Sequence, residues 1–203
     1  MDHRTQWNER FAADHFVFGT EPNRFLTEQA YRIAPHGRVL AVADGEGRNG
    51  VWLAQQGFAV TGIDISEVGQ EKAARLAAER GVTLDLRLVD VAAWDWPENA
   101  YDGVVAIFIQ FADPALRATL FDGMKRATRP GGRLLLQGYR PKQLDYGTGG
   151  PRAVENLYTE EMLREAFADW EIEHLVSHDS PVDEGPGHKG LSALIDLVAR
   201  KPA

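Results

Sequence analysis

The sequence contains no cysteine and no long apolar run. The absence of cysteine excludes disulfide bonds, a thiolate nucleophile and cysteine-ligated metal sites. No apolar stretch approaches the ~20 residues that a membrane-spanning helix needs. The first ten residues, MDHRTQWNER, are polar and charged and do not have the pattern of a signal peptide. We therefore expect a cytoplasmic protein that does not enter a membrane.

Basic residues are outnumbered by acidic ones and form no cluster. The 203 residues include 22 Lys and Arg against 30 Asp and Glu, which gives a formal net charge of −8. Because contacts with phosphates supply most of the affinity for DNA and RNA, such a chain is a poor nucleic-acid binder. No group of His, Asp and Glu has metal-ligand spacing, so no metal site is expected. The length suits one domain, residues 1–203, and the expected partner is a small molecule.

The most informative stretch of the chain ends at Asp64. An apolar run at residues 39–43 predicts a strand that is buried on both faces. It leads into a turn whose glycines let the backbone approach a ligand closely. A helix at 48–56 and a second strand at 58–63 follow, and Asp64 comes directly after that strand. The carboxylate lies roughly 20 residues after the glycines, the separation at which it can bind ribose hydroxyls.

The charge of the turn bears on the kind of cofactor. Asp44 and Glu46 both lie within it, and they would repel the diphosphate of a dinucleotide. A cofactor with a positively charged sulfonium and an amino group would not be repelled. The two acids therefore favour S-adenosylmethionine over NAD or FAD.

Residues 39–64 resemble motif I and the following acidic strand of the class I S-adenosylmethionine-dependent methyltransferases. The sequence GEGRN at 45–49, together with WNERF at 7–11, is most similar to a bacterial subgroup that includes the tellurite-resistance methyltransferases. The likeness covers nearly the whole chain. It implies that residues 1–34 form a cap over the methionine end of the cofactor.

The same resemblance implies a set of cofactor contacts. Asp90 would accept a hydrogen bond from the adenine amine, and Val91 would offer its backbone. Ala41 stands where many family members have an acid, a contact that Asp44 or Glu46 could replace. The predicted cofactor-binding residues are Trp7, Phe11, Ala43, Asp44, Gly45, Glu46, Arg48, Asn49, Asp64, Ile65, Asp90, Val91 and Ile107.

Strands and helices alternate along the rest of the chain. Further strands are expected at 83–89, 101–108, 133–139, 170–177 and 193–199, and helices are expected to begin at the N-caps Ser66, Asp113 and Thr159. Residues 140–157 and 179–190 are predicted to be loops. The alternation predicts a Rossmann-like, doubly wound α/β sheet of seven strands with helices on both faces. The last strand should be antiparallel, because only a short loop joins it to the strand before.

Ligands of such a sheet bind beyond the carboxyl ends of its strands. The predicted substrate-side residues are the polar side chains that follow those ends, Gln110, Tyr139, Arg140 and His188. His188 is a candidate base or substrate hydrogen-bond partner, and the alternative is a surface histidine in a flexible loop. Arg140 could pair with an anionic substrate, or it could be an exposed loop arginine.

The sequence therefore predicts an S-adenosylmethionine-dependent methyltransferase (EC 2.1.1.-) that acts on a small molecule by in-line displacement, mainly by aligning the acceptor with the methyl group. The resemblance allows a soft acceptor such as a thiol or a chalcogen oxyanion. The altered Ala41 and Ala43 keep a non-catalytic S-adenosylmethionine-binding protein open as an alternative. A nicotinamide-dependent oxidoreductase is a further alternative. A nucleic-acid or protein methyltransferase should show a basic or extended docking surface, and the sequence shows neither.

Overall fold

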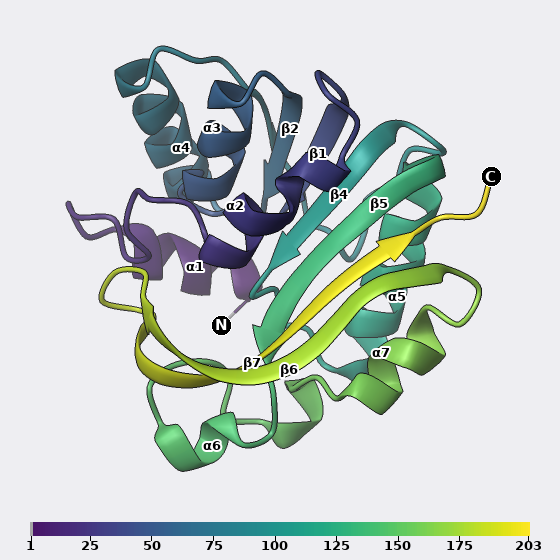
Figure 1. Cartoon of the computed structure of the whole chain (residues 1–203). Coiled ribbons are helices and arrows are strands. Elements are labelled where there is room, and N and C mark those ends of the chain that lie inside the picture. The colour runs from purple at the N-terminus through teal and green to yellow at the C-terminus, as the bar shows by residue number, and fades with distance from the viewer. Residues whose placement is uncertain (1) are drawn as a thin grey trace.

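The computed structural model describes residues 2–203, which form one sheet with helices on both faces (Figure 1). The strands are β1 (Arg38–Val42), β2 (Ala59–Asp64), β3 (Asp85–Leu88), β4 (Tyr101–Ile107), β5 (Thr128–Tyr139), β6 (Glu171–Asp183) and β7 (Lys189–Arg200). Their order across the sheet is β3-β2-β1-β4-β5-β7-β6. Strands β1 to β5 pair in parallel, whereas β7 is antiparallel to both β5 and β6. The predicted Rossmann-like sheet with an antiparallel last strand is confirmed.

The helices lie in two layers. They are α1 (His3–Phe11), α2 (Arg24–Gln29), α3 (Arg48–Gln55), α4 (Glu67–Glu79), α5 (Pro114–Ala127), α6 (Gln143–Tyr146) and α7 (Glu160–Ala166), with the short 3-10 helices η1 (Ala30–Arg32) and η2 (Val154–Asn156). Figure 1 shows α3 and α4 beside β1 and β2, and α5 and α7 behind the opposite face of the sheet. None of the helices within residues 2–203 is long and apolar enough to cross a bilayer.

Strand β1 is apolar throughout because both of its faces are covered. Successive side chains of a strand point to opposite faces. Val39 and Ala41 pack in the core that includes residues of α2 and α3, while Leu40 and Val42 pack in the core that includes residues of α5 and α7. All four side chains are buried. The central strands therefore carry no alternation of polar and apolar residues.

Three helices begin at the residues expected as N-caps. The side chains of Ser66, Asp113 and Thr159 each accept a hydrogen bond from the backbone N–H three residues further on. Ser66 and Asp113 follow closely on the carboxyl ends of β2 and β4. The caps therefore fix where the chain turns back over the sheet, at the edge where ligands are expected.

The two predicted loops are wrong in part. Residues 140–157 contain α6 and η2, and most of 179–190 is strand, because β6 runs to Asp183 and β7 begins at Lys189. Pairing between the two strands supplies hydrogen bonds that the local sequence does not reveal. Pro181 is tolerated within β6 because that strand lies at the edge of the sheet. The connection that carries His188 is therefore a tight turn.

Candidate cofactor and substrate site

Figure 1 shows α1 beside the carboxyl ends of β1, β2 and β4. Two adjoining pockets are lined by residues of α1 and of these strand ends. The first pocket has a volume of about 330 Å³ and the second a volume of about 570 Å³. The residues that line both of them are His3, Trp7, Asp64 and Phe111. Asp64, the last residue of β2, therefore lies where the two pockets meet.

The turn after β1 brings the backbone close to the first pocket. Ala43, Gly45 and Gly47 have φ angles of 49°, 56° and 86°, which strain any residue that has a Cβ. A Cβ on Gly45 would lie 3.1 Å from the ring of Phe11, and one on Gly47 would lie 2.6 Å from the Cβ of Ala73. The turn needs these glycines both for its conformation and for the close packing of α1 and α4. Ala43 adopts the left-handed conformation without being glycine.

Asp64 is a buried carboxylate that forms no ion pair within residues 2–203. Its Oδ2 accepts a hydrogen bond from the N–H of Gly45 and its Oδ1 accepts one from the N–H of Ser66, each at 2.8 Å. Burial raises the pKa of Asp64, while these backbone hydrogen bonds act in the opposite direction. A carboxylate has about four acceptor positions, so each oxygen can still accept a hydrogen bond from a ligand.

Glu46 lies on the opposite side of the turn and lines neither pocket. Its carboxylate pairs with the ammonium group of Lys72 at 2.8 Å. It also accepts hydrogen bonds from the N–H groups of Val17 and Phe18, at 2.8 Å and 3.3 Å. The side chain of Glu46 therefore anchors residues 12–23, a segment that we call the strap, and cofactor binding by Glu46 stays a prediction that these contacts do not support.

Arg48 and Asn49 line the first pocket, but their polar ends also hold the strap. Arg48 pairs with Glu184 at 2.6 Å and donates to the carbonyl of Glu21 at 3.3 Å. The side-chain oxygen of Asn49 accepts a hydrogen bond from the N–H of Asn23 at 2.9 Å. The GEGRN sequence therefore builds the turn with its glycines and fastens the strap with its polar side chains.

Asp44 lines the first pocket, and its carboxylate accepts a hydrogen bond from the N–H of Gly50 at 3.0 Å. Burial raises the pKa of Asp44 to about 7. Since Glu46 is neutralised by Lys72 and Asp44 is only partly ionised at neutral pH, the turn carries less negative charge than its sequence indicates. The charge argument for a sulfonium cofactor consequently rests on Asp64 more than on the turn.

Helix α1 turns one face toward the first pocket. His3, Trp7, Arg10 and Phe11 all line it, and residues three and four apart share a helix face. The rings of Trp7 and Phe11 stack with their centroids 5.3 Å apart. Trp7 and Phe11, which the sequence predicts to bind the cofactor, both line this pocket. His3 and Arg10 were missed, although their spacing from Trp7 places them on the same face.

The remaining predicted cofactor residues divide between the pockets. Ile65, Asp90 and Val91 line the second pocket, and Ile107 lines the first. Asp90 accepts a hydrogen bond from the N–H of Ala92 at 3.0 Å, which fixes the end of β3 beside the pocket. The structure thus brings these residues to the same sheet edge as Asp64, in the order that the sequence predicts.

Aromatic rings enclose His188 in the wall of the first pocket. The centroid of its ring lies 4.5 Å from those of Phe18 and Phe108 and 5.8 Å from that of Tyr139. Only 8% of His188 is exposed, so the flexible surface histidine is ruled out. Its buried Nδ1 lies 3.9 Å from the carboxylate of Glu184, which is beyond hydrogen-bond distance. Burial lowers the pKa of His188, so the imidazole is neutral at neutral pH.

Gln110 and Tyr139 both line the first pocket but are bonded to each other. The amide nitrogen of Gln110 donates to the carbonyl of Tyr139 at 2.9 Å, and its oxygen accepts from the N–H of Tyr139 at 2.6 Å. Gln110 therefore positions Tyr139. The residues of this pocket that sequence reasoning missed are His3, Gln6, Arg10, Phe18, Val42, Val105, Phe108, Ile109, Phe111, Gly150 and Pro151. Phe108 and Phe111 follow β4 directly, so the strand-end rule that selected Gln110 also applies to them.

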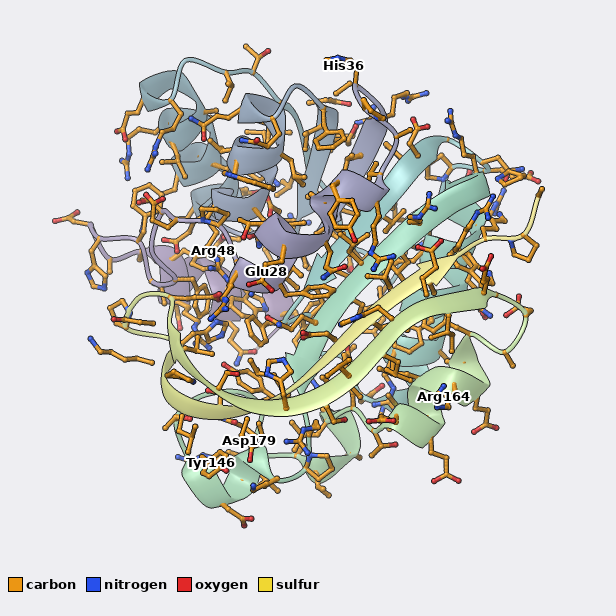
Figure 2. All side chains as sticks on the ribbon, in the orientation of Figure 1. Glu28, His36, Arg48, Tyr146, Arg164 and Asp179 are labelled. Carbon is orange, nitrogen blue, oxygen red and sulfur yellow. The ribbon has the colours of Figure 1, made fainter. Side chains whose placement is uncertain are left out.

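Arg140 lies outside both pockets. It pairs with Asp179 and donates to the carbonyl of Leu194 at 2.9 Å. Asp179 also accepts a hydrogen bond from the hydroxyl of Tyr146 at 2.9 Å, and Figure 2 shows these two side chains together near α6, well away from Arg48. The side chain of Arg140 joins the end of β5 to the outer strands, and its substrate role stays a prediction that these contacts do not support.

Comparison with known proteins agrees with this architecture. Residues 39–132 match the family model described as a methyltransferase domain. The match covers just under half of the chain, so the likeness to the methyltransferase family concerns these residues. They run from β1 to the start of β5 and so contain the glycine turn, Asp64 and Asp90. The predicted family is confirmed.

Relatives of the methyltransferase domain are distant. Phosphatidylethanolamine N-methyltransferase of Cereibacter sphaeroides is 33% identical over 132 residues, which are 63% of this chain and 64% of the relative. The chain thus spans just under two thirds of that curated relative and about half of the mycobacterial relatives that match next.

Solved structures share the fold over nearly the whole chain. TehB of Haemophilus influenzae has a TM-score of 0.73 at 21% identity and covers 98% of this chain and 66% of its own. The 1,6-didemethyltoxoflavin-N1-methyltransferase of Burkholderia thailandensis, solved with bound S-adenosylhomocysteine, has a TM-score of 0.70 at 19% identity and covers 98% and 87%. At these identities the likeness concerns the fold alone.

Proposed function

We propose that this protein transfers a methyl group from S-adenosylmethionine to a small-molecule acceptor. The observation that carries the proposal is Asp64, a buried carboxylate without a cation at the junction of two pockets. The adenosine part of the cofactor would occupy the second pocket and its amino-acid end would enter the first. The family of residues 39–132 and the S-adenosylhomocysteine bound to the Burkholderia enzyme support the same cofactor.

The residues present fit this cofactor. Asp64 retains acceptor positions for two ribose hydroxyls, and Gly45 leaves space where a side chain would meet Phe11. Asp90 and Val91 line the second pocket, where they can meet the adenine edge. We expect the predicted cap of residues 1–34 to cover the cofactor with α1 and the strap, because Trp7 and Phe18 line the first pocket. When bound, S-adenosylmethionine supplies an electrophilic methyl group on a positively charged sulfur.

The first pocket limits the acceptor to a small molecule. Its volume of about 330 Å³ is at the lower end of the ~300–1,000 Å³ typical of ligand sites, and the cofactor takes part of it. Phe18, Phe108 and Tyr139 exclude water from the region around His188. A neutral His188 can accept the proton of an acceptor, and the enclosing rings restrict how the acceptor lies, which supplies the alignment that methyl transfer needs.

A thiol or a related soft acceptor suits this pocket best. A thiol ionises near neutral pH, so one histidine of lowered pKa is a sufficient base. Polarisable sulfur also packs favourably against aromatic rings. The rings of Phe18 and Phe108 are the surfaces that would make these contacts.

The test is methyl transfer from labelled S-adenosylmethionine to a panel of small thiols, chalcogen oxyanions, small amines and phosphatidylethanolamine vesicles. We expect transfer to a thiol or chalcogen acceptor, and a lower rate in His188→Asn with unchanged binding of S-adenosylhomocysteine. Binding of S-adenosylhomocysteine without transfer to any acceptor would make the protein a non-catalytic binder. Binding of NADH in its place would favour the oxidoreductase.

A further inference from the structure

One ring nitrogen of His188 has no hydrogen-bond partner within residues 2–203. This atom, Nδ1, is buried, and buried polar atoms of native proteins are nearly always paired. A carboxylate oxygen of Glu184, Oε2, lies 3.9 Å from it. A hydrogen bond from nitrogen to oxygen spans about 2.7–3.2 Å, and such bonds between catalytic groups often reach that length only in the reacting complex. Glu184 is therefore the partner that a small movement would bring to Nδ1.

Two other side chains hold the carboxylate of Glu184. Its Oε2 pairs with the guanidinium of Arg48 at 2.6 Å, and its Oε1 accepts a hydrogen bond from the amide of Asn23 at 2.9 Å. Burial acts to raise the pKa of Glu184, but His188 and Arg48 together lower it to about 2. The carboxylate is thus ionised at neutral pH, and it still has acceptor positions to offer.

The backbone keeps Glu184 and His188 in one tight turn between β6 and β7. The N–H of Glu184 donates to the carbonyl of His188 at 2.9 Å, and the N–H of His188 donates to the carbonyl of Gly185 at 3.1 Å. A Cβ on Gly187 would lie 2.4 Å from the ring of Phe18, so the turn packs closely against the strap. The two side chains consequently stay beside each other.

The negative charge of Glu184 decides which ring nitrogen of His188 carries the proton. In a neutral imidazole one nitrogen is an N–H donor and the other is an acceptor. A lone pair on Nδ1 would be repelled by the carboxylate, whereas an N–H is attracted to it. The proton therefore belongs on Nδ1. The lone pair then remains on Nε2, the nitrogen that can accept a proton in the first pocket, which His188 lines.

We propose that Glu184 is a positioning residue for methyl transfer, whose carboxylate accepts a hydrogen bond from the Nδ1–H of His188 and so keeps Nε2 free to act as the base. This inference rests on the proposed function. As the acceptor atom bonds to the methyl carbon, Nε2 takes the proton of the acceptor, and the electron pair of the breaking carbon–sulfur bond stays on sulfur. Glu184 stabilises the positive charge that forms on His188.

The test is the tautomer of His188, read by NMR from the long-range couplings between ring protons and ring nitrogens in protein labelled with [15N]histidine. Spectra are recorded at about pH 8, above the ordinary pKa of an imidazole. The signal that is absent from His188→Asn belongs to His188. In the wild type we expect the proton on Nδ1. Glu184→Gln should move it to Nε2, because the charge that favours Nδ1–H is lost and an amide can donate to Nδ1.

Asp183→Asn is the matched control. Asp183 precedes Glu184 in the chain, and its exposed carboxylate pairs with the equally exposed Lys189. This variant should keep the tautomer and the kcat of the wild type. With an identified acceptor, Glu184→Gln should lower kcat at least tenfold, which is part of the roughly hundred-fold that a positioned base contributes. Its affinity for S-adenosylhomocysteine should stay that of the wild type.

Other results would overturn the inference. A proton on Nε2 in the wild type would do so even if Glu184→Gln fails to fold. A proton that stays on Nδ1 in folded Glu184→Gln would show that another group sets the tautomer. A moved proton with an unchanged kcat would end the positioning role and leave methyl transfer in place. Failure of the wild type to bind S-adenosylhomocysteine would instead overturn the proposed function, and this inference with it, whatever the tautomer.

Discussion

The glycine turn after β1 has two sides that use buried carboxylates in opposite ways. On the side of the pockets, Asp64 accepts backbone hydrogen bonds from Gly45 and Ser66 and has no cation beside it within residues 2–203. On the side of the strap, Glu46 accepts backbone hydrogen bonds as well but is neutralised by Lys72. Glu46 has Lys72 beside it and acts as a structural anchor. Within the described residues, Asp64 has only backbone donors beside it and is free to bind a ligand.

The two environments have different energetic consequences. Burial without a cation raises the pKa of Asp64, so its ionised form is stabilised further when a ligand donates hydrogen bonds. Glu46 needs no ligand, because Lys72 and the strap backbone already satisfy it. Changes on the strap side should therefore alter stability, and changes on the pocket side should alter binding or turnover.

The largest effect is expected for Glu46→Gln, which leaves Lys72 buried without its partner. Breaking a buried ion pair on one side destabilises proteins by about 3–5 kcal/mol. The measurement is the free energy of unfolding in urea, with Glu79→Gln at the exposed end of α4 as the control. A loss below about 1 kcal/mol would mean that the strap is not anchored in this way.

The next effect concerns turnover at the acceptor side. His188→Asn should lower kcat by about a hundred-fold with an identified acceptor, because proton transfer by a positioned side chain contributes at least that much. The pKa of His188 is lowered from 6.5, so wild-type activity should fall only as pH drops through a value below 6.5. An unchanged kcat in the variant would show that His188 takes no part in the reaction. A loss of wild-type activity that already begins above pH 6.5 would show the same.

Asp44, on the pocket side of the turn, should make the free energy of unfolding depend on pH. Its pKa rises from 3.8 to about 7 on folding, so between these values the folded state binds more protons than the unfolded state. The free energy of unfolding should therefore fall as pH rises from 5 to 8. Asp44→Asn should remove about 1–2 kcal/mol of this fall, measured by denaturation at both pH values. Parallel curves for the two proteins would contradict the raised pKa.

The smallest effect is expected for Arg140→Gln. Arg140 pairs with the partly exposed Asp179 outside both pockets, and such pairs contribute about 1 kcal/mol or less. The Michaelis constant and kcat should stay within about twofold of the wild type. A large rise in the Michaelis constant for an anionic acceptor would restore the substrate role that the sequence predicted.

The features that the sequence predicted correctly are local ones. The apolar run of β1, the glycines of the turn and the N-cap Ser66 are each written in a few neighbouring residues, and they place Asp64 at the sheet edge. Side-chain partners could not be predicted in this way. Glu46 meets Lys72, which lies 26 residues away, and Arg140 meets Asp179, which lies 39 residues away.

The acceptor half of the site depends on long-range contacts most of all. Phe18 reaches His188 because the strap is fastened by residues of the glycine turn, and the turn that carries His188 is fixed by pairing between β6 and β7. No local pattern signals either contact. The sequence predicted His188 as a candidate site residue in a loop. It did not predict that the imidazole is buried among aromatic rings.

The central claim is that Asp64 binds the ribose of S-adenosylmethionine. The most direct measurement is calorimetric titration of S-adenosylhomocysteine into the wild type, Asp64→Asn and the control Asp85→Asn, which changes an exposed carboxylate on β3. We expect Asp64→Asn to weaken binding by about 1–3 kcal/mol, because an acceptor for two buried hydroxyls is impaired, and Asp85→Asn to bind as the wild type does. Equal affinity in the wild type and Asp64→Asn would contradict the claim and place the ribose elsewhere.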